Sequence, residues 1–249
     1  MHPIPTLERS RPMLTELTVP ARTYLATPPE FRRHVPQALG YWWRGERRRK
    51  AWAPHMSNAR GLIDTGIDDL ATRRTVVVLG SGPLFDIPLE SLARTFARVV
   101  LVDRVHPASI RPRLGRYRNI DPIHRDLSPA AGADPLAFLE TIADLDWVIS
   151  ANLLGAIADA APAGMARQVV DSHLDGLARL RCTATLIADL DYRVVNRHGV
   201  VRESGDLLHG REVPRSGLRW KWEVAPFGAD HRHLRRVHSV AAWPDWRQA

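Results

Sequence analysis

The fold of this chain is decided by the stretch TVVVLGSGPLFDIP, residues Thr75 to Pro88. Its first five residues form a β-branched, apolar run, and the turn Gly80-Ser81-Gly82 follows at once. From Leu89 to Arg98 the apolar residues then recur at helical spacing. The stretch therefore predicts a buried strand, a tight loop and a helix.

The loop has the composition of a ligand-binding turn. Small residues let the backbone approach a bound group closely, and the free N–H groups at the start of the next helix favour a negative or strongly polar group. Asp86 is placed to cap that helix, and Pro88 is tolerated in its first turn. Gly-x-Gly also occurs in tight connections that bind nothing, so the loop alone does not distinguish a ligand-binding turn from a tight connection.

Length and composition indicate an ordinary globular protein. The 249 residues, 45% of them hydrophobic, suffice for one large α/β domain or for a domain with a helical extension. No stretch approaches the roughly 20 apolar residues of a membrane span, and Met1 to Leu17 carries Arg, Glu and Pro. We expect a soluble, cytoplasmic protein that does not bind membranes. Cys182 is the only cysteine, which excludes an intramolecular disulfide and cysteine-based zinc clusters.

The chain is strongly basic, with a net charge of +8 and almost only arginine as the source. A basic surface can bind nucleic acid or an acidic substrate, but this arginine is spread along the whole chain. The densest run, Arg44 to Lys50, follows the aromatic residues Tyr41 to Trp43. It has two interpretations, an RNA- or phosphate-binding patch and a solvated helix face beside a buried aromatic stripe, and the second is favoured.

The pattern of the chain divides it into two parts. Residues 1–72 lack a strand pattern and predict a Pro-rich arm followed by a broken helical cap, with helices over 29–53 and 57–70. Residues 73–249 alternate strands and helices, which is typical of βαβ units. We expect strands over 75–79, 99–103, 119–124, 146–150 and 184–191, helices over 89–98, after Asp134 and over 162–180, a hairpin over 194–201 and a last pair of strands over 220–224 and 234–243.

These elements predict an α/β fold, a Rossmann-like, doubly wound and mostly parallel sheet with a C-terminal antiparallel strand pair and an N-terminal helical cap. Ligands of such sheets lie beyond the carboxyl ends of the strands, so Gly80, Asp103, Asp126 and Asn152 should meet at one rim. Asp103 follows Gly80 by 23 residues, close to the spacing at which a carboxylate accepts hydrogen bonds from ribose hydroxyls. Nucleoside binding is therefore expected.

In this arrangement the sequence resembles the class I S-adenosylmethionine-dependent methyltransferases over residues 74–243. The resemblance implies that the glycine loop holds the methionine part of the cofactor, that the acid after the second strand holds the ribose, and that an acid after the third strand contacts the adenine amine. It also implies that the segment after the fourth strand faces the reacting methyl group. The cofactor-binding residues implied are Gly80, Ser81, Gly82, Pro83, Asp103, Asp126, Leu127, Ser150 and Asn152.

The terminal antiparallel pair is typical of that family and not of nicotinamide-binding domains, which favours S-adenosylmethionine over NAD as the cofactor. The chain departs from the family at two positions. Leu79 stands where an acid is usual, and Leu84 stands where a third glycine is usual. The run Gly-Ser-Gly-Pro-Leu is also similar to the loop of nicotianamine synthases, which transfer the aminocarboxypropyl group of the same cofactor.

The resemblance implies a methyltransferase acting on a small molecule or a protein side chain. The alternatives are an RNA methyltransferase, an aminocarboxypropyl transferase and a non-catalytic binder of S-adenosylmethionine. RNA is not favoured, because no RNA-binding module is present and Ser150-Ala151-Asn152-Leu153 lacks the Asn/Asp-Pro-Pro-aromatic motif of enzymes that methylate base amino groups.

A general base is needed only when the acceptor loses a proton, and the candidates for base or orienting residue are Asn152, Asp191 and Tyr192. His231, His233 and His238 have no carboxylate or cysteine at a matching ligand spacing, so we expect no metal.

Overall fold

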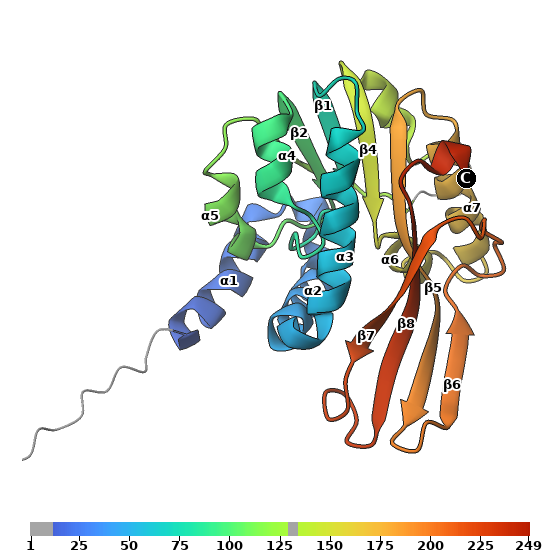
Figure 1. Cartoon of the computed structure of the whole chain (residues 1–249). Helices are drawn as coiled ribbons and strands as arrows, with labels where there is room; N and C mark the ends of the chain where they lie inside the picture. The colour runs from blue at the N-terminus through green and yellow to red at the C-terminus, as the bar shows by residue number, and fades with distance from the viewer. Residues whose placement is uncertain (1–11, 129–133) are drawn as a thin grey trace, which may run out of the picture.

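The protein is built in three layers around one central sheet (Figure 1). The computed structural model describes residues 12–128 and 134–249, with side chains from residue 18 onward, so residues 1–11 of the expected N-terminal arm lie outside the described residues. The strands are β1 (Thr75–Leu79), β2 (Arg98–Asp103), β3 (Ile120–His124), β4 (Leu145–Ala151), β5 (Thr183–Asn196), β6 (Val201–Asp206), β7 (Leu218–Ala225) and β8 (Leu234–Trp243).

The order of the strands in the sheet is β3-β2-β1-β4-β5-β8-β7, with β6 paired to the outer half of β5. The first five strands are parallel, whereas β8 runs antiparallel between β5 and β7. The order reverses between β1 and β4, and the carboxyl ends on either side of that point are where open α/β sheets bind ligands. The predicted fold class, including the antiparallel strands at the end of the chain, is confirmed.

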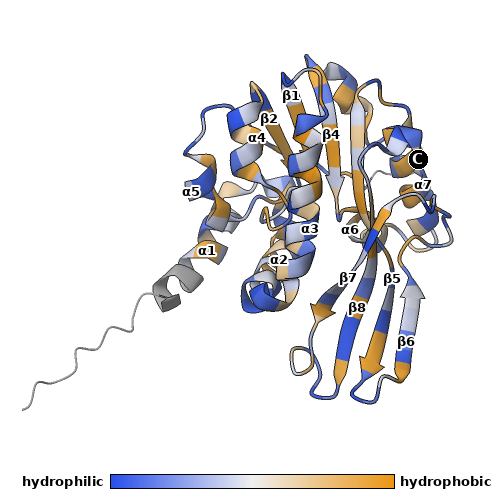
Figure 2. Cartoon of the chain, in the orientation of Figure 1, coloured by the Kyte–Doolittle hydropathy of each residue, from blue (hydrophilic) through white to orange (hydrophobic). Residues whose placement is uncertain are grey.

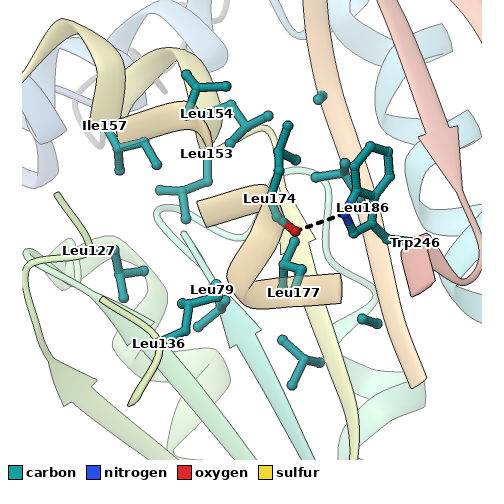
Figure 3. Packing of buried hydrophobic residues seen from close by; sticks show 14 of the residues in the cluster. Leu79, Leu127, Leu136, Leu153, Leu154, Ile157, Leu174, Leu177, Leu186 and Trp246 are labelled. Atoms are coloured by element: carbon teal, nitrogen blue, oxygen red, sulfur yellow. Dashed lines mark hydrogen bonds between the residues drawn. The ribbon is translucent and has the colours of Figure 1, made fainter. Parts of the chain in front are cut away.

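Helices cover both faces of the sheet, and each face has its own apolar core (Figures 1 and 2). On one face lie α3 (Arg49–Asp68), α4 (Leu89–Thr95), η2 (Ala108–Ile110) and α5 (Arg111–Leu114). On the other lie η3 (Ala137–Thr141), α6 (Leu154–Asp159), α7 (Ala166–Ala178) and η4 (Trp246–Gln248). In the second core, Trp246 donates a hydrogen bond of 2.9 Å from Nε1 to the carbonyl of Leu174 (Figure 3).

The first described elements are helices that cross the carboxyl ends of the strands. These are α1 (Pro12–Ala26), η1 (Pro29–His34) and α2 (Val35–Arg47), as Figure 1 shows. The break after α2 falls at Arg48, and α3 continues through Pro54, where the sequence predicted a gap between two helices. Pro54 lies early in α3 and removes one intrahelical hydrogen bond, which the burial of Trp52 and His55 against the sheet offsets.

The helix α3 shares its core with β1, β2 and β4, because Trp52, Ala59 and Ile63 pack among their side chains. The division of the chain at residue 72 stays a prediction. The helices differ from expectation in several places. The helix after Asp134 is reduced to the short η3, α1 lies within the expected Pro-rich arm, and η2, α5, α6 and η4 had no counterpart in the predicted pattern. Within the described residues, no helix has both the length and the apolar character needed to cross a membrane.

Candidate functional site

A cleft of about 540 Å³ lies at the carboxyl ends of β1, β2, β4 and β5, beneath α2. The loops after β1, β2 and β4 line one part of it, and residues of β5, β7 and β8 line another. The cleft is therefore at the rim that the sequence predicted, and the terminal antiparallel strands extend its wall.

The loop after β1 is a left-handed turn that brings backbone into the cleft. Gly80 and Gly82 have φ angles of 74° and 43°, and a Cβ on Gly80 would lie 3.0 Å from side-chain atoms of Leu153. Leu84 also has a positive φ, 60°, which costs a non-glycine residue about 1–2 kcal/mol. Its side chain is fully buried, as is that of Leu79, and neither lines the cleft. Both departures from the family pattern are thus residues of the core.

Asp103, the last residue of β2, fixes this loop in place. Its Oδ2 accepts a hydrogen bond from the backbone N–H of Gly82 at 2.9 Å, and its Oδ1 accepts one from Val105 at 3.2 Å. Each carboxylate oxygen can accept a further hydrogen bond, and Asp103 lines the cleft. The carboxylate is therefore oriented to receive hydroxyl groups of a ligand.

An apolar slot continues from Asp103 along the rim. It is lined by Val105, Leu127 and Ile157, all of them buried. Asp126 does not line the cleft, because its Oδ1 accepts hydrogen bonds from both the backbone N–H and the hydroxyl of Ser128. The slot suits a flat apolar ring, and the contact of Asp126 with an adenine amine stays a prediction.

Ser150 and Asn152, at the end of β4 and just after it, lie in different surroundings. Ser150 points away from the cleft into the core against α7, where its hydroxyl is 2.9 Å from Nε2 of His173. Burial lowers the pKa of His173 to about 4. Asn152 does line the cleft, with a φ of 51° and its backbone N–H bonded to the carbonyl of Ile187 at 2.8 Å.

The side chain of Asn152 belongs to a buried polar network that the sequence did not reveal. Its Nδ2 donates to Oδ2 of Asp86 at 2.9 Å, and Oδ1 of Asp86 is 3.3 Å from Nε2 of His55. The indole N–H of Trp220 donates to Nδ1 of His55 at 3.0 Å, so Nδ1 must accept and the proton of a neutral imidazole is on Nε2. Asp86 is thus part of this network and not the cap of α4, which begins after Pro88.

The carboxyl group of Asp86 is held ionised by these neighbours. Burial by itself would raise its pKa, but the contacts with His55 and Asn152 and the charge of Arg60 together place the pKa below its ordinary value. A buried aspartate that is fully engaged in this way positions Asn152 without being free to exchange protons. The only signal for the network in the sequence is one histidine within a helix, which is too common to single out.

The antiparallel strands contribute Asp189, His238 and Trp222 to the cleft in place of the predicted Asp191 and Tyr192. A β-bulge between Asp189 and Asp191 pairs Asp189 with Val240 and Asp191 with Ser239. Since successive residues of a strand point to opposite faces, Asp189 shares the face of His238, whereas Asp191 faces the other way.

Only Asp191 is turned away by that register, because Tyr192 is paired directly with His238 and is kept from the cleft by its bond to Glu203 on β6. Asp191 accepts a hydrogen bond of 2.7 Å from the hydroxyl of Ser239, and Tyr192 donates one of 2.6 Å to Glu203. Asp189 instead has its Oδ2 2.7 Å from Nδ1 of His238. A one-residue bulge leaves no mark in the alternation of residue types, so the sequence carried no signal that Asp189, and not Asp191, lines the cleft.

The helix α2 closes the cleft with one face. Its lining residues are Gln37, Ala38, Tyr41 and Arg44, preceded by His34 at the end of η1 and followed by Arg48. Burial raises the pKa of Tyr41 well above its ordinary value, and the negative charges of Asp86 and Asp189 add to the effect.

The basic run Arg44 to Lys50 does not form one surface. The side chain of Arg48 is only 9% exposed, donates to the carbonyl of Val224 at 2.9 Å and pairs with Asp230. Trp52 donates to the same carbonyl at 3.0 Å. Arg49 pairs with Glu46 of α2. Arg48 therefore joins the cap to β7 and to the turn that follows it, an outcome that neither interpretation of the sequence included.

No metal centre is formed by the described residues, in which no three His, Cys, Asp or Glu side chains are grouped to hold an ion. His231 and His233 are exposed in the turn between β7 and β8, whereas His238 lies in the strand that follows. His238 therefore lies in a different element from His231 and His233, whose ring centres are 6.2 Å apart.

No family model matches the sequence, and no curated protein matches it either. Among solved structures, the chain is similar to 1,6-didemethyltoxoflavin-N1-methyltransferase of Burkholderia thailandensis, solved with 1,6-didemethyltoxoflavin and S-adenosylhomocysteine, at 14% identity and a TM-score of 0.40, over 75% of this chain and 77% of that one. It is similar to DhpI in complex with S-adenosylhomocysteine, at 16% identity and a TM-score of 0.39, over 82% and 94% of the two chains.

A third similar structure is the 23S rRNA methyltransferase ErmE, at 14% identity and a TM-score of 0.33, over 75% of this chain and 69% of that one. At this level of similarity the alignments leave activity and substrate open. The assignment of the fold rests on the strand order of the sheet itself, β3-β2-β1-β4-β5-β8-β7 with β8 antiparallel.

Proposed function

We propose that this protein is an S-adenosylmethionine-dependent methyltransferase. The observation that carries the proposal is the carboxylate of Asp103 at the end of β2, bonded to the glycine loop after β1, in a sheet whose order ends with an antiparallel β8. That combination of strand order, loop and acid matches the family that the sequence resembles. It separates this fold from nicotinamide-binding domains, which lack the antiparallel end.

The residues of the cleft fit such a cofactor. Ser81 Oγ is a buried polar atom without a hydrogen-bond partner among the described residues, and Arg104 Nη1 has no hydrogen bond among them but is 3.9 Å from Oδ1 of Asp126; Ser81 and Arg104 both line the cleft. Buried polar atoms of this kind call for a partner, and a nucleoside with an amino-acid tail offers hydroxyl, carboxylate and amine groups. Gly80, Ser81, Gly82 and Pro83 would hold the tail, Asp103 the ribose, and the slot at Leu127 the base.

The remaining predicted contacts have less support. Asp126 and Ser150 keep their predicted roles only through the resemblance, because neither lines the cleft. Asn152 lines it and retains an unpartnered Oδ1, so it stays a candidate for orienting the reacting groups.

When bound, S-adenosylmethionine supplies a methyl group made electrophilic by its sulfonium. The chain then has to hold the acceptor in line with that methyl group and to exclude water. The helix α2 and the clamp from Arg48 to Val224 supply a cover over the cleft. A fixed polar network around Asn152 supplies rigidity beside it.

We favour a small-molecule acceptor. Aromatic side chains enclose the part of the cleft beyond the glycine loop, namely Tyr41, Trp52, Phe85 and Trp222. A protein side chain remains the second possibility. An RNA substrate needs a continuous basic surface, and the run Arg44 to Lys50 is instead divided between the cleft wall, the clamp and an ion pair within the cap.

The proposal is tested by thermal unfolding with S-adenosylmethionine, S-adenosylhomocysteine and NAD. A ligand at 100 times its dissociation constant stabilises by about 2.7 kcal/mol, so the sulfur nucleosides should raise the melting temperature and NAD should not. Stabilisation by NAD alone would contradict the proposal. Mass spectrometry of the nucleoside product then separates methyl transfer, which leaves S-adenosylhomocysteine, from aminocarboxypropyl transfer, which leaves methylthioadenosine.

A further inference from the structure

One corner of the cleft holds three polar atoms that the protein leaves unpartnered. They are Oδ1 of Asp189, Nε2 of His238 and Nε1 of Trp222, on β5, β8 and β7. All three residues line the cleft, and none of these atoms has a hydrogen-bond partner within the described part of the chain. Native proteins rarely leave buried polar atoms without a partner, so three in one corner indicate a ligand group that supplies the missing hydrogen bonds.

Asp189 orients His238 so that the imidazole can accept a proton. Oδ2 of Asp189 is 2.7 Å from Nδ1 of His238, and a carboxylate can only accept, so Nδ1 of the imidazole carries the proton. In the neutral imidazole the lone pair is then on Nε2, the atom without a partner. The bulge at Leu190 brings Asp189 onto the face of His238, and the two side chains are 15% and 13% exposed.

The neighbouring indole adds a donor. Trp222 is paired with His238 across β7 and β8, and their ring centres are 5.8 Å apart, so the two unpartnered nitrogens belong to neighbouring rings of the same corner. An indole N–H can only donate, whereas Nε2 of the oriented imidazole accepts. A hydroxyl group satisfies both, because its hydrogen is donated to His238 while its oxygen accepts from Trp222.

The walls of this corner indicate a planar molecule. Trp222 stacks on His55 with ring centres 4.1 Å apart and an interplanar angle of 8°, and it meets the edge of Trp52 at 5.0 Å. These contacts fix the indole, so the corner is a preformed aromatic surface. Aromatic rings pair with one another by stacking or by edge contacts, so such a surface favours a flat aromatic ligand.

Resting on the proposed function, we infer that this corner binds the hydroxyl group of a planar aromatic acceptor, and that His238, positioned by Asp189, accepts the proton of that hydroxyl during transfer. The bond between the acceptor oxygen and the methyl carbon forms as the sulfur–carbon bond breaks. The electron pair of the broken bond stays on sulfur, and the proton passes to Nε2 of His238. The products are an aromatic methyl ether, a thioether and an imidazolium paired with Asp189.

The inference is tested with three probes that differ in one group, 4-nitrophenol, 4-nitroaniline and 4-nitroanisole. Nitroaromatic rings quench tryptophan fluorescence, so binding beside Trp222 is measured directly in the presence of S-adenosylhomocysteine. We expect 4-nitrophenol to bind about tenfold more tightly than 4-nitroanisole, as for one or two added hydrogen bonds. The preference should disappear in His238→Gln and persist in His233→Gln, which changes an exposed histidine of the neighbouring turn.

Each other outcome overturns the inference. Equal binding of phenol and anisole, a phenol preference that survives in His238→Gln, or binding of no probe would each show that the corner does not take a hydroxyl group. A preference for 4-nitroaniline would assign the corner to an amine instead. Thermal unfolding with S-adenosylhomocysteine is run on the same proteins. If that ligand stabilises them and the probes fail, only this inference fails, whereas the absence of stabilisation contradicts the proposed function.

The positioning role of Asp189 has its own readout. In nitrogen-15 spectra of histidine-labelled protein, assigned with His238→Gln, the signal of His238 should report a proton on Nδ1 and a bare Nε2. In Asp189→Asn the amide has no preference for that tautomer, so the signal should move towards a mixture. A proton on Nε2 in the unmodified protein, or an unchanged tautomer in Asp189→Asn, would remove the lone pair or the positioning that the inference requires.

Discussion

Replacement of Asp103 by asparagine is the most direct perturbation of the proposed cofactor site. The two carboxylate oxygens accept from Gly82 and Val105 at 2.9 and 3.2 Å, and an amide keeps only one acceptor oxygen. The backbone N–H of Gly82 or of Val105 then faces the NH2 group of the asparagine, which is also a donor. The negative charge that strengthens hydrogen bonds to ligand hydroxyls is lost as well. A hydrogen bond to a charged group contributes about 1.5–3 kcal/mol, which is a loss of roughly tenfold to 150-fold in affinity.

The assay is thermal unfolding at one fixed concentration of S-adenosylhomocysteine, set at 100 times the dissociation constant of the unmodified protein. There the ligand stabilises by about 2.7 kcal/mol, or about 5–10 °C for a chain of this size. After a tenfold loss the same concentration gives about 1.4 kcal/mol, so the shift in melting temperature should fall to about half or less.

The control is Asp121→Asn, which changes an aspartate on β3 that pairs with Arg98 outside the cleft. This variant should keep the full ligand-induced shift. A full shift in Asp103→Asn would refute the placement of the ribose at this carboxylate, whatever the stability of the two variants without ligand.

Three further perturbations act on the fold around the cleft. Burial holds the pKa of His173 near 4, so below about pH 6.5 the unfolded chain binds a proton that the folded protein does not. The free energy of unfolding should therefore fall by about 3 kcal/mol between pH 6.5 and pH 4. Measured by urea unfolding, the free energy of unfolding should depend less on pH in His173→Gln than in the unmodified protein, and the same pH dependence in both would contradict this. Gly80→Ala adds a Cβ that lies 3.0 Å from the side chain of Leu153, whereas Gly199→Ala has a similar φ and open space around its Cβ. The melting temperature should therefore fall further in Gly80→Ala than in Gly199→Ala. Arg48→Met should lower the free energy of local opening of the cap by about 1–3 kcal/mol, measured as faster amide hydrogen exchange in α2 and not in α7. The same exchange rates in α2 of the variant and of the unmodified protein would argue against the clamp.

Much of the fold follows from patterns that a few residues establish. The run Thr75 to Leu79 is fully buried as β1, and the apolar pattern around Val100 and Val148 gives its two neighbours in the sheet. Burial on both faces makes such strands continuous apolar runs, which are the easiest elements to identify. The antiparallel pair was visible because Trp220, Trp222 and Val224 alternate with polar residues.

The candidate site was only partly visible in the sequence. Gly80 and Asp103 follow buried strands directly, so their place at the rim follows from the topology. His55 and His238 come from a helix of the cap and from the last strand, and only tertiary packing brings them to the cleft. Asp189 was missed because a bulge changes the face of a strand without changing its composition.

The contacts of the cap with Val224 can form only after β7 has been synthesised. Arg48 and Trp52 are separated from that carbonyl by 176 and 172 residues along the chain. The helices of the cap leave the ribosome before β7 does, and at about 5–20 residues per second the intervening chain takes roughly 10–30 seconds to be made. During that time Trp52 lacks both the carbonyl of Val224 and the ring of Trp222 on which it packs.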